Sequence, residues 1–276
     1  MDRPRPEGPK PLSPVEKISL ASRESRRVSL IFILILAVLF VASTGFTRFN
    51  PLAAFLAQSE FWNFILADFV PPFMGKWAAL GRAVMQTLYM AVAATGISSV
   101  ISLGLSLLGS RAAVRSPALN GLIRGFASIL RNIPDLVWAF ILVAAFGIGT
   151  AVGVLALIIA TTGQLTRFFI ETLDEAAEET MEPLLASGAA VPQVMAQAIL
   201  PAALPGFIAW ILYSVELNIR ASTILGMVGA GGIGLLLMGY IKQYNYAAAS
   251  TAIVAVALIV IGVNLLTDFL QKIILR

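Results

Sequence analysis

The sequence contains no cysteine and no histidine among its 276 residues, and only 12% of the residues are charged. The lack of cysteine excludes disulfide bonds and thiol chemistry. The lack of histidine removes the commonest general base and the commonest metal ligand, so we expect no catalytic residue and no metal site. No phosphate-binding loop with its lysine is present, so ATP is not expected to bind this chain. These absences argue against a redox enzyme or an intramembrane metalloprotease.

Apolar residues dominate what is present. Hydrophobic residues make up 58% of the chain, and several apolar runs reach the roughly 20 residues that a helix needs to cross a bilayer. The runs are continuous rather than alternating, which favours helices over a β-barrel. The sequence therefore predicts an all-α polytopic membrane protein with about six transmembrane helices. The expected spans are residues 28–46, 79–108, 119–146, 153–170, 202–221 and 247–270.

Two segments are expected to lie outside the helical core formed by residues 79–276. Residues 1–27 hold five prolines and seven lysines or arginines, which predicts a disordered, basic tail. Residues 47–78 are rich in Phe and Trp and contain Pro71-Pro72, which indicates an outer segment with a short interfacial helix. Basic residues cluster in both tails and after the second span, so the positive-inside rule predicts cytoplasmic termini. Basic residues at membrane boundaries account for the net charge of +4, so nucleic-acid binding is not needed to explain it.

An acidic island interrupts the apolar sequence between residues 171 and 201. It holds six of the fifteen acidic residues, and no Lys or Arg lies between Glu171 and Pro201. Thr180 or Glu182 is suited to cap a short helix with Pro183 in its first turn, and a glycine six residues later is suited to end it. Composition alone leaves a solvated loop equally open. The six acidic residues are Glu171, Asp174, Glu175, Glu178, Glu179 and Glu182.

The spacing within this island resembles a loop of bacterial ABC importer permeases. The family pattern is Glu-Ala-Ala, three residues, Gly, nine residues, Ile, one residue and Leu-Pro, and the chain departs from it at Pro183, Leu184 and Ala198. In that family the loop carries the coupling helix, which sits in a groove of the ATPase. The resemblance therefore implies an ATPase-coupling loop over residues 171–201. Its implied site residues are Glu182, Pro183, Leu184, Leu185, Gly188, Leu200 and Pro201.

Two further segments, residues 131–139 and 216–226, resemble phosphonate-type permeases, and the similarity extends from about residue 81 to the C-terminus. The glycine-rich segment that follows is shared with methionine-type importers. It also satisfies a dinucleotide-binding pattern, but the acidic residue required about twenty positions later is missing, so we reject that function. We expect an irregular or re-entrant element in which glycine permits close packing. Its glycines are Gly226, Gly229, Gly231, Gly232 and Gly234.

Four charges lie within expected spans, in pairs four residues apart. Arg131 and Asp135 form one pair, and Glu216 and Arg220 form the other, with Asn218 between them. Charges inside a membrane usually face a partner or a wet cavity. We expect two ion pairs, because each arginine has an acid in reach. The alternative is a path for an anion, since arginine suits the oxygens of phosphonates.

The resemblance implies the permease subunit of an ATP-driven importer with a methionine-importer-like core of type I, located in the bacterial inner membrane. The expected cargo is phosphonate, phosphite or a similar small phosphorus oxyanion. The implied partners are a second copy of the chain, two ATPase subunits that bind ATP and Mg²⁺, and a periplasmic or lipid-anchored binding protein. Two alternatives are an ion-gradient-driven secondary transporter and an ABC permease for another small solute, such as an amino acid. A membrane enzyme is disfavoured.

Overall fold

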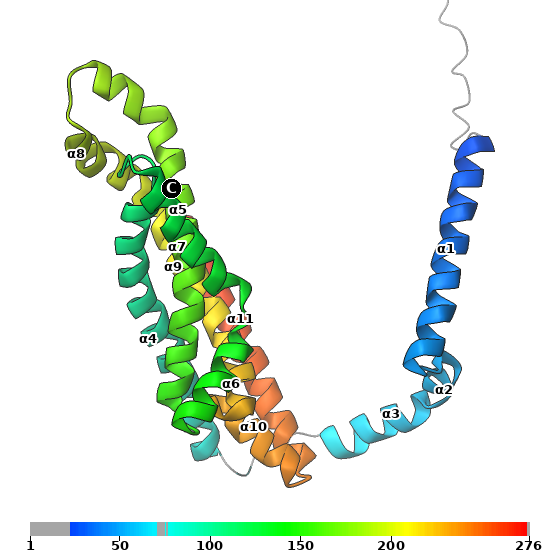
Figure 1. The fold of residues 1–276 in the computed structure, drawn as a ribbon. Coiled ribbons are helices and arrows are strands. Elements are labelled where there is room, and N and C mark those ends of the chain that lie inside the picture. Colours follow the sequence, from blue (N-terminus) through cyan, green and yellow to red (C-terminus); the bar gives the residue numbers. More distant parts are fainter. Residues whose placement is uncertain (1–22, 71–74, 76, 275–276) are drawn as a thin grey trace, which may run out of the picture. The chain divides into compact units, whose positions relative to one another are not determined.

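The computed structural model describes residues 23–70, 75 and 77–274 (Figure 1). Every regular element in these residues is a helix, which confirms the all-α fold. Residues 1–22 of the expected tail and Pro71-Pro72 lie outside the described residues. The elements are α1 (Arg23–Thr47), α2 (Pro51–Leu56), α3 (Gln58–Phe64), η1 (Ile65–Phe69), α4 (Trp77–Gly109), α5 (Pro117–Asn132), α6 (Asp135–Phe146), α7 (Thr150–Ala186), α8 (Val191–Val194), η2 (Met195–Ile199), α9 (Leu200–Leu225), η3 (Gly226–Ala230), α10 (Gly232–Lys242) and α11 (Tyr246–Ile274).

The chain divides into two units, residues 1–62 and residues 63–276. In the first unit, Arg27–Thr47 is long and apolar enough to cross a membrane. Helix α1 begins at Arg23, so residues 23–27 are helical rather than part of a disordered tail, because the helix of the apolar run continues into them. The short helix expected in residues 47–78 appears as α2, whose first amides are capped by the Asn50 side chain.

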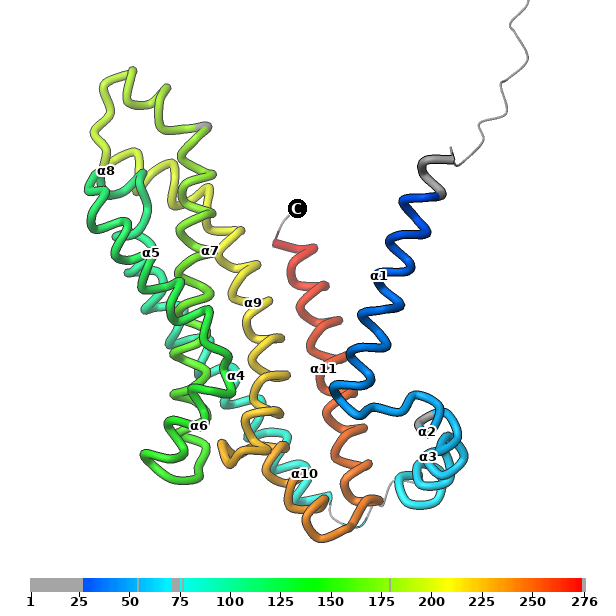
Figure 2. Tube along the Cα trace, turned by 45° about the vertical axis from the view of Figure 1, so that its right-hand side comes forward, coloured from blue at the N-terminus to red at the C-terminus, as the bar shows by residue number. Residues whose placement is uncertain are grey.

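Helix α7 forms the centre of the second unit and lies beside α4 and α9 (Figures 1 and 2). Of the residues in its membrane-crossing stretch 61% are buried, against 6% for α11. Serines on α4 face α7 and allow a close approach: Ser98 Oγ donates to Ile158 O and Ser102 Oγ donates to Thr162 O, each at 3.1 Å. Small hydroxyl side chains therefore join the two long helices while satisfying their own polar atoms.

The expected number of spans is reached only when one bent pair of helices counts as a span. Five segments are long and apolar enough to cross a membrane, and α5 with α6 makes the sixth. The span expected over residues 119–146 is sharply broken, because α5 and α6 meet at 82°. Pro134 causes the break: it forces the preceding Ile133 into an extended conformation, with φ −86° and ψ 119°.

The glycine-rich segment is irregular, as the sequence predicts. The π-helical turn η3 leads into α10, an apolar helix of 11 residues. Gly226 and Gly234 bring the two pieces into backbone contact. A Cβ on Gly234 would lie 1.9 Å from Thr223 O, and one on Gly226 would lie 2.3 Å from Gly231 O. Only glycine fits where two backbones approach this closely.

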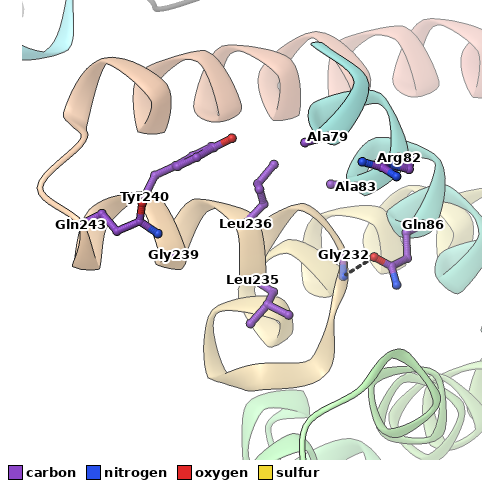
Figure 3. Close-up of a pocket in the computed structure, with 10 residues that line it drawn as sticks. All are labelled: Ala79, Arg82, Ala83, Gln86, Gly232, Leu235, Leu236, Gly239, Tyr240 and Gln243. Atoms are coloured by element: carbon purple, nitrogen blue, oxygen red, sulfur yellow. Dashed lines mark hydrogen bonds between the residues drawn. The ribbon is translucent and has the colours of Figure 1, made fainter. Parts of the chain in front are cut away.

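Helix α4 caps the start of α10 from the side. Gly232 N donates to Gln86 Oε1 at 3.3 Å, and Ile233 N donates to Thr87 Oγ1 at 2.9 Å. Figure 3 shows the first of these bonds at the edge of a cavity that also contains Arg82 and Tyr240. The two bonds satisfy amides that the first turn of a helix leaves without an intrahelical partner. They fix the start of α10 against α4.

We predict that Gly234→Ala lowers the folded yield and thermal stability of the chain, because the new methyl group overlaps Thr223 O. Overpacking of this kind costs about 1–3 kcal/mol. Gly239→Ala is the matched control in the same helix, since a Cβ there meets nothing within 4 Å. The measurement is monodisperse yield and thermal unfolding in detergent. Equal behaviour of the two variants would contradict the close packing.

Candidate translocation cleft and coupling turn

A cleft of about 270 Å³ opens beside α7 where α5, α6 and α9 meet. Five charged or polar residues were expected to form ion pairs or a path for an anion. The cleft brings four of them together from helices that are far apart in the sequence. Polar side chains from α7 complete its wall. The lining includes Arg131, Asp135, Thr161, Gln164, Asn218 and Arg220.

The expected ion pair between Arg131 and Asp135 is not formed. Arg131 lies in the last turn of α5 and Asp135 in the first turn of α6, on opposite sides of the 82° bend. Residues four apart face each other only along one continuous helix, and here the helix is broken. Within the part of the chain that the structure describes, Arg131 has no ion-pair partner, and its side chain is exposed at the cleft.

The second expected pair is formed. Arg220 Nη2 donates to Glu216 Oε1 at 2.9 Å along α9. The carboxylate is 12% exposed and the guanidinium is 54% exposed, so the acid is the inner member and the arginine faces outward into the cleft. A guanidinium has five N–H donors, and one contact with Glu216 leaves most of them available.

Asn218 ties three helices together in the wall of the cleft. Its Oδ1 accepts from Thr161 Oγ1 of α7 at 2.9 Å, and its Nδ2 donates to Thr95 Oγ1 of α4 at 2.8 Å. The residue is only 4% exposed. A buried amide with both ends bonded fixes the relative positions of its neighbours. Asn218 therefore holds the cleft wall in place.

The acidic island is not a separate short helix. Helix α7 runs without interruption from Thr150 through Pro183 to Ala186, so a helix start at Pro183 is wrong. The intervening residues are mostly Ala and Glu, which are strong helix formers. A proline so near the end of a helix removes a single backbone bond. The apolar residues Leu173, Ala177 and Met181 recur every four positions and pack inward, which carries the helix through the island.

Gly188 ends α7 in the way expected of a glycine, with φ +94°. Gly188 N donates to Leu185 O at 3.0 Å, and Ala189 N donates to Leu184 O at 3.2 Å. This pair of bonds is the Schellman motif, which satisfies the last carbonyls of a helix and reverses the chain. The turn presents Glu182, Leu184 and Gly188 to solvent.

The return from this turn is packed against α7. Val194, Met195 and Ile199 are buried in a core with Leu173 and Ala177. Leu200 and Pro201 begin α9, directly after the π-helical turn η2. The residues that the resemblance implies for coupling thus lie at two places, the exposed turn and the start of α9. The two places are joined by this small core.

Asp174 has a role that the sequence did not reveal. Its Oδ1 accepts from Ser110 Oγ at 2.7 Å and from Arg111 N at 3.2 Å, and its Oδ2 accepts from Arg124 Nη2 at 2.5 Å. Arg124 Nε also donates to Gly109 O at 3.1 Å. This carboxylate therefore clamps the α4–α5 connection to α7. Six acids in one island look alike in sequence, and only the contacts across 50 to 64 residues distinguish this one.

Residues 104–276 match the family of binding-protein-dependent transport system inner membrane components. The chain belongs to this family. It is 34% identical to the phosphite transport system permease protein PtxC of Stutzerimonas stutzeri over 208 residues, 75% of this chain and 76% of that one. It is 31% identical to the phosphate-import permease protein PhnE of Mycolicibacterium smegmatis over 211 residues, 76% of this chain and 40% of that one.

The fold has a solved counterpart. A chain of the MetNI methionine ABC transporter, in an inward-facing conformation, superposes with a TM-score of 0.65 at 22% identity. The match covers 74% of this chain and all of that chain. The expected methionine-importer-like permease core is therefore confirmed as a fold.

We predict that Asp174→Ala destabilises the chain by about 1–3 kcal/mol, because it leaves Arg124 and the Arg111 amide without their acceptor. Glu178→Ala, one turn along the same helix, removes an exposed carboxylate outside the clamp and serves as control. Thermal unfolding in detergent measures both. The double variant Asp174→Ala with Arg124→Ala is expected to recover part of the loss. A double variant that loses the full sum of the single effects would show that the two residues are not coupled.

Proposed function

We propose that this chain is the membrane permease of an ATP-driven importer for phosphite, phosphonate or a similar small phosphorus oxyanion. The observation that carries the proposal is the cleft, where the unpaired guanidinium of Arg131 and the outward-facing guanidinium of Arg220 border one space. Guanidinium groups bind phosphorus oxyanions through paired N–H donors. The relatives named for phosphite and phosphate import support the same class of cargo.

The balance of charge in the cleft suits an ion that passes rather than stays. Arg131, Asp135 and Arg220 line the cleft, and Glu216 lies outside its lining but is paired with Arg220, so the four charges sum to zero. An anion would be held by local N–H donors, without a large net positive field. Transport requires an anion to bind well enough to enter and weakly enough to leave.

The proposed assembly contains two copies of this chain, two ATPase subunits that bind ATP and Mg²⁺, and a periplasmic or lipid-anchored binding protein. The family description and the MetNI counterpart support ATP-driven, binding-protein-dependent transport. The sequence has no phosphate-binding loop of its own. In the bacterial inner membrane, both termini and the Gly188 turn would face the cytoplasm, as the distribution of basic residues predicts.

The Gly188 turn is proposed to contact the ATPase. It is exposed, it carries the apolar Leu184 at 36% exposure, and it ends a helix that continues into the cleft wall at Thr161 and Gln164. Closure of the ATPases would displace the turn and, through α7, the wall of the cleft. Alternating access by rigid movement of packed helices follows this scheme.

We predict that Arg131→Gln lowers ATP-dependent phosphite uptake at least about tenfold, since a lost charge-assisted hydrogen bond is worth about 1.5–3 kcal/mol. The assay uses proteoliposomes that contain the permease, its ATPase and its binding protein. Arg82→Gln removes an exposed arginine outside this cleft and is the control. Normal uptake by Arg131→Gln would overturn the assignment of the path. Uptake driven by an ion gradient without ATP would support a secondary transporter instead.

We predict that Gly188→Val uncouples the ATPase without loss of membrane abundance. A Cβ on Gly188 meets nothing within 4 Å, so the cost arises from the positive φ and stays local to the turn. Gly188→Asn is the control, because asparagine tolerates this conformation. ATPase co-purification, uptake and abundance are measured together. If Gly188→Val transports normally, or fails only because the chain no longer accumulates, this turn is not the coupling element.

A further inference from the structure

We propose that Arg167 forms a second contact for the transported anion, between the translocation cleft and the Gly188 turn, and that Glu171 limits how long the anion stays there. The inference rests on the proposed function of the chain. Both residues lie in α7, outside the lining of the cleft. They form an ion pair along the helix, in which Arg167 Nε donates to Glu171 Oε1.

The pair continues the face of α7 that lines the cleft. Ala160 and Gln164 belong to the lining, and further steps of three and four residues toward the Gly188 turn lead to Arg167 and Glu171. Residues at these spacings share one face of a helix with 3.6 residues per turn. The step from Gln164 to Arg167 is about 4.5 Å along the axis, at 1.5 Å per residue. We call Gln164, Arg167 and Glu171 the polar face of α7.

The opposite face of α7 is apolar and packed. Leu165, Phe169 and Leu173 are at most 1% exposed and belong to one buried cluster, whereas the side chains of Arg167 and Glu171 are 39% and 44% exposed. The stretch Thr150–Glu178 is long and apolar enough to cross a membrane. Charged side chains within such a stretch usually face a partner or a wet cavity rather than lipid. This places the polar face of α7 beside water that continues from the cleft.

Other contacts than this ion pair join α7 to α9, which lie side by side (Figure 2). Phe168 of α7 stacks on Trp210 of α9 with ring centroids 3.9 Å apart, and Trp210 Nε1 donates to Thr172 Oγ1 at 3.2 Å. These contacts hold the two helices at the level of the pair. A partly exposed ion pair within one helix adds little stability. A purely structural role therefore does not explain why two charges are kept in a span.

Arg167 can bind an anion while its pair with Glu171 is intact. The guanidinium has five N–H donors, and the bond to Glu171 uses the one on Nε. The remaining donors, on the two Nη atoms, make no hydrogen bond within the described residues and suit two oxygens of a phosphorus oxyanion. Arg220 is paired with Glu216 in the same way at the cleft. An arginine that is held by an acid one turn away thus occurs twice along the proposed path.

Glu171 keeps the contact weak. Its carboxylate competes for the guanidinium and repels the anion, which favours release over retention. Arg167 is also the last basic residue of α7, since no Lys or Arg lies between it and Ala186. An anion that leaves the cleft toward the Gly188 turn therefore meets Arg167 as the final cation of this helix.

The first test measures ATP-dependent phosphite uptake in proteoliposomes that contain the permease, its ATPase and its binding protein. We expect Arg167→Gln to lower uptake at least about tenfold, the effect of one charge-assisted hydrogen bond. Arg167→Lys is expected to restore part of the uptake, because lysine keeps the charge but lacks the planar fork. Arg115→Gln removes an exposed arginine outside the cleft and the polar face of α7, and is expected to leave uptake unchanged. Membrane abundance and ATPase co-purification are measured for each variant.

The second test measures phosphite binding to the full chain in nanodiscs without partner proteins, by phosphorus nuclear magnetic resonance. The chain carries Arg131→Gln, which impairs binding at the cleft. Adding Glu171→Gln frees Arg167 and is expected to strengthen phosphite binding at least about tenfold. Adding Arg167→Gln as well is expected to abolish that gain. Glu178→Gln in place of Glu171→Gln removes an exposed carboxylate of α7 that is not paired with Arg167, and is expected to give no gain.

The outcomes separate this inference from the proposed function. If Arg131→Gln lowers uptake but Arg167→Gln behaves like Arg115→Gln, the second contact is wrong and the cleft stands. Normal uptake by Arg131→Gln overturns the path and this inference with it. No gain from Glu171→Gln, an equal gain from Glu178→Gln, or a gain that survives Arg167→Gln would each overturn the second contact alone. The comparison of Glu171→Gln with Glu178→Gln keeps Arg167 in place, so it decides even where Arg167→Gln fails to fold.

Discussion

The packing of α4 against α7 is the interaction on which the rest of the core depends. In a bilayer, every polar group on such a surface needs a partner within the protein. Short hydroxyl side chains meet much of this requirement: Ser98 and Ser102 donate to α7 carbonyls and permit a close approach. Thr162 Oγ1 and Thr166 Oγ1 of α7 are buried and have no partner among the described residues. Asn218 extends the contact to α9 through Thr95 and Thr161. One polar seam therefore sets the positions of the three helices that form the cleft wall and its support.

The continuity of α7 makes this packing relevant to function. Thr161 in the cleft wall and Gly188 at the turn are 27 residues apart on one nearly unbroken helix, a length of roughly 40 Å at 1.5 Å per residue. A rigid element of that length transmits a displacement at one end to the other without local deformation. The Asp174 clamp joins the α4–α5 connection to the same helix. In the proposed function, the turn, the clamp and the cleft wall would move as one body.

Local chemistry in the sequence was enough to predict most of the fold. Long apolar runs indicated the spans, and the dense glycines after α9 indicated an irregular element. Two of the errors, the helix start at Pro183 and the ion pair between Arg131 and Asp135, have one physical cause, which is that proline acts differently according to its position. Pro183 lies in the last turn of a helix built from strong helix formers and is tolerated, whereas Pro134 follows a residue that it forces out of the helix. The sequence pattern alone does not distinguish these two settings.

The candidate sites were predictable only where spacing along one helix determines contact. Glu216 and Arg220 are paired because α9 is continuous through them, and Arg131 is unpaired because its helix ends one residue later. Long-range contacts such as Asp174 with Arg124 and Ser110 depend on the assembled bundle. The same break that separates Arg131 from Asp135 leaves both facing one cleft. A broken helix thus leaves Arg131 without the ion pair that a continuous helix would have formed with Asp135, and in the proposed function this arginine would face the anion.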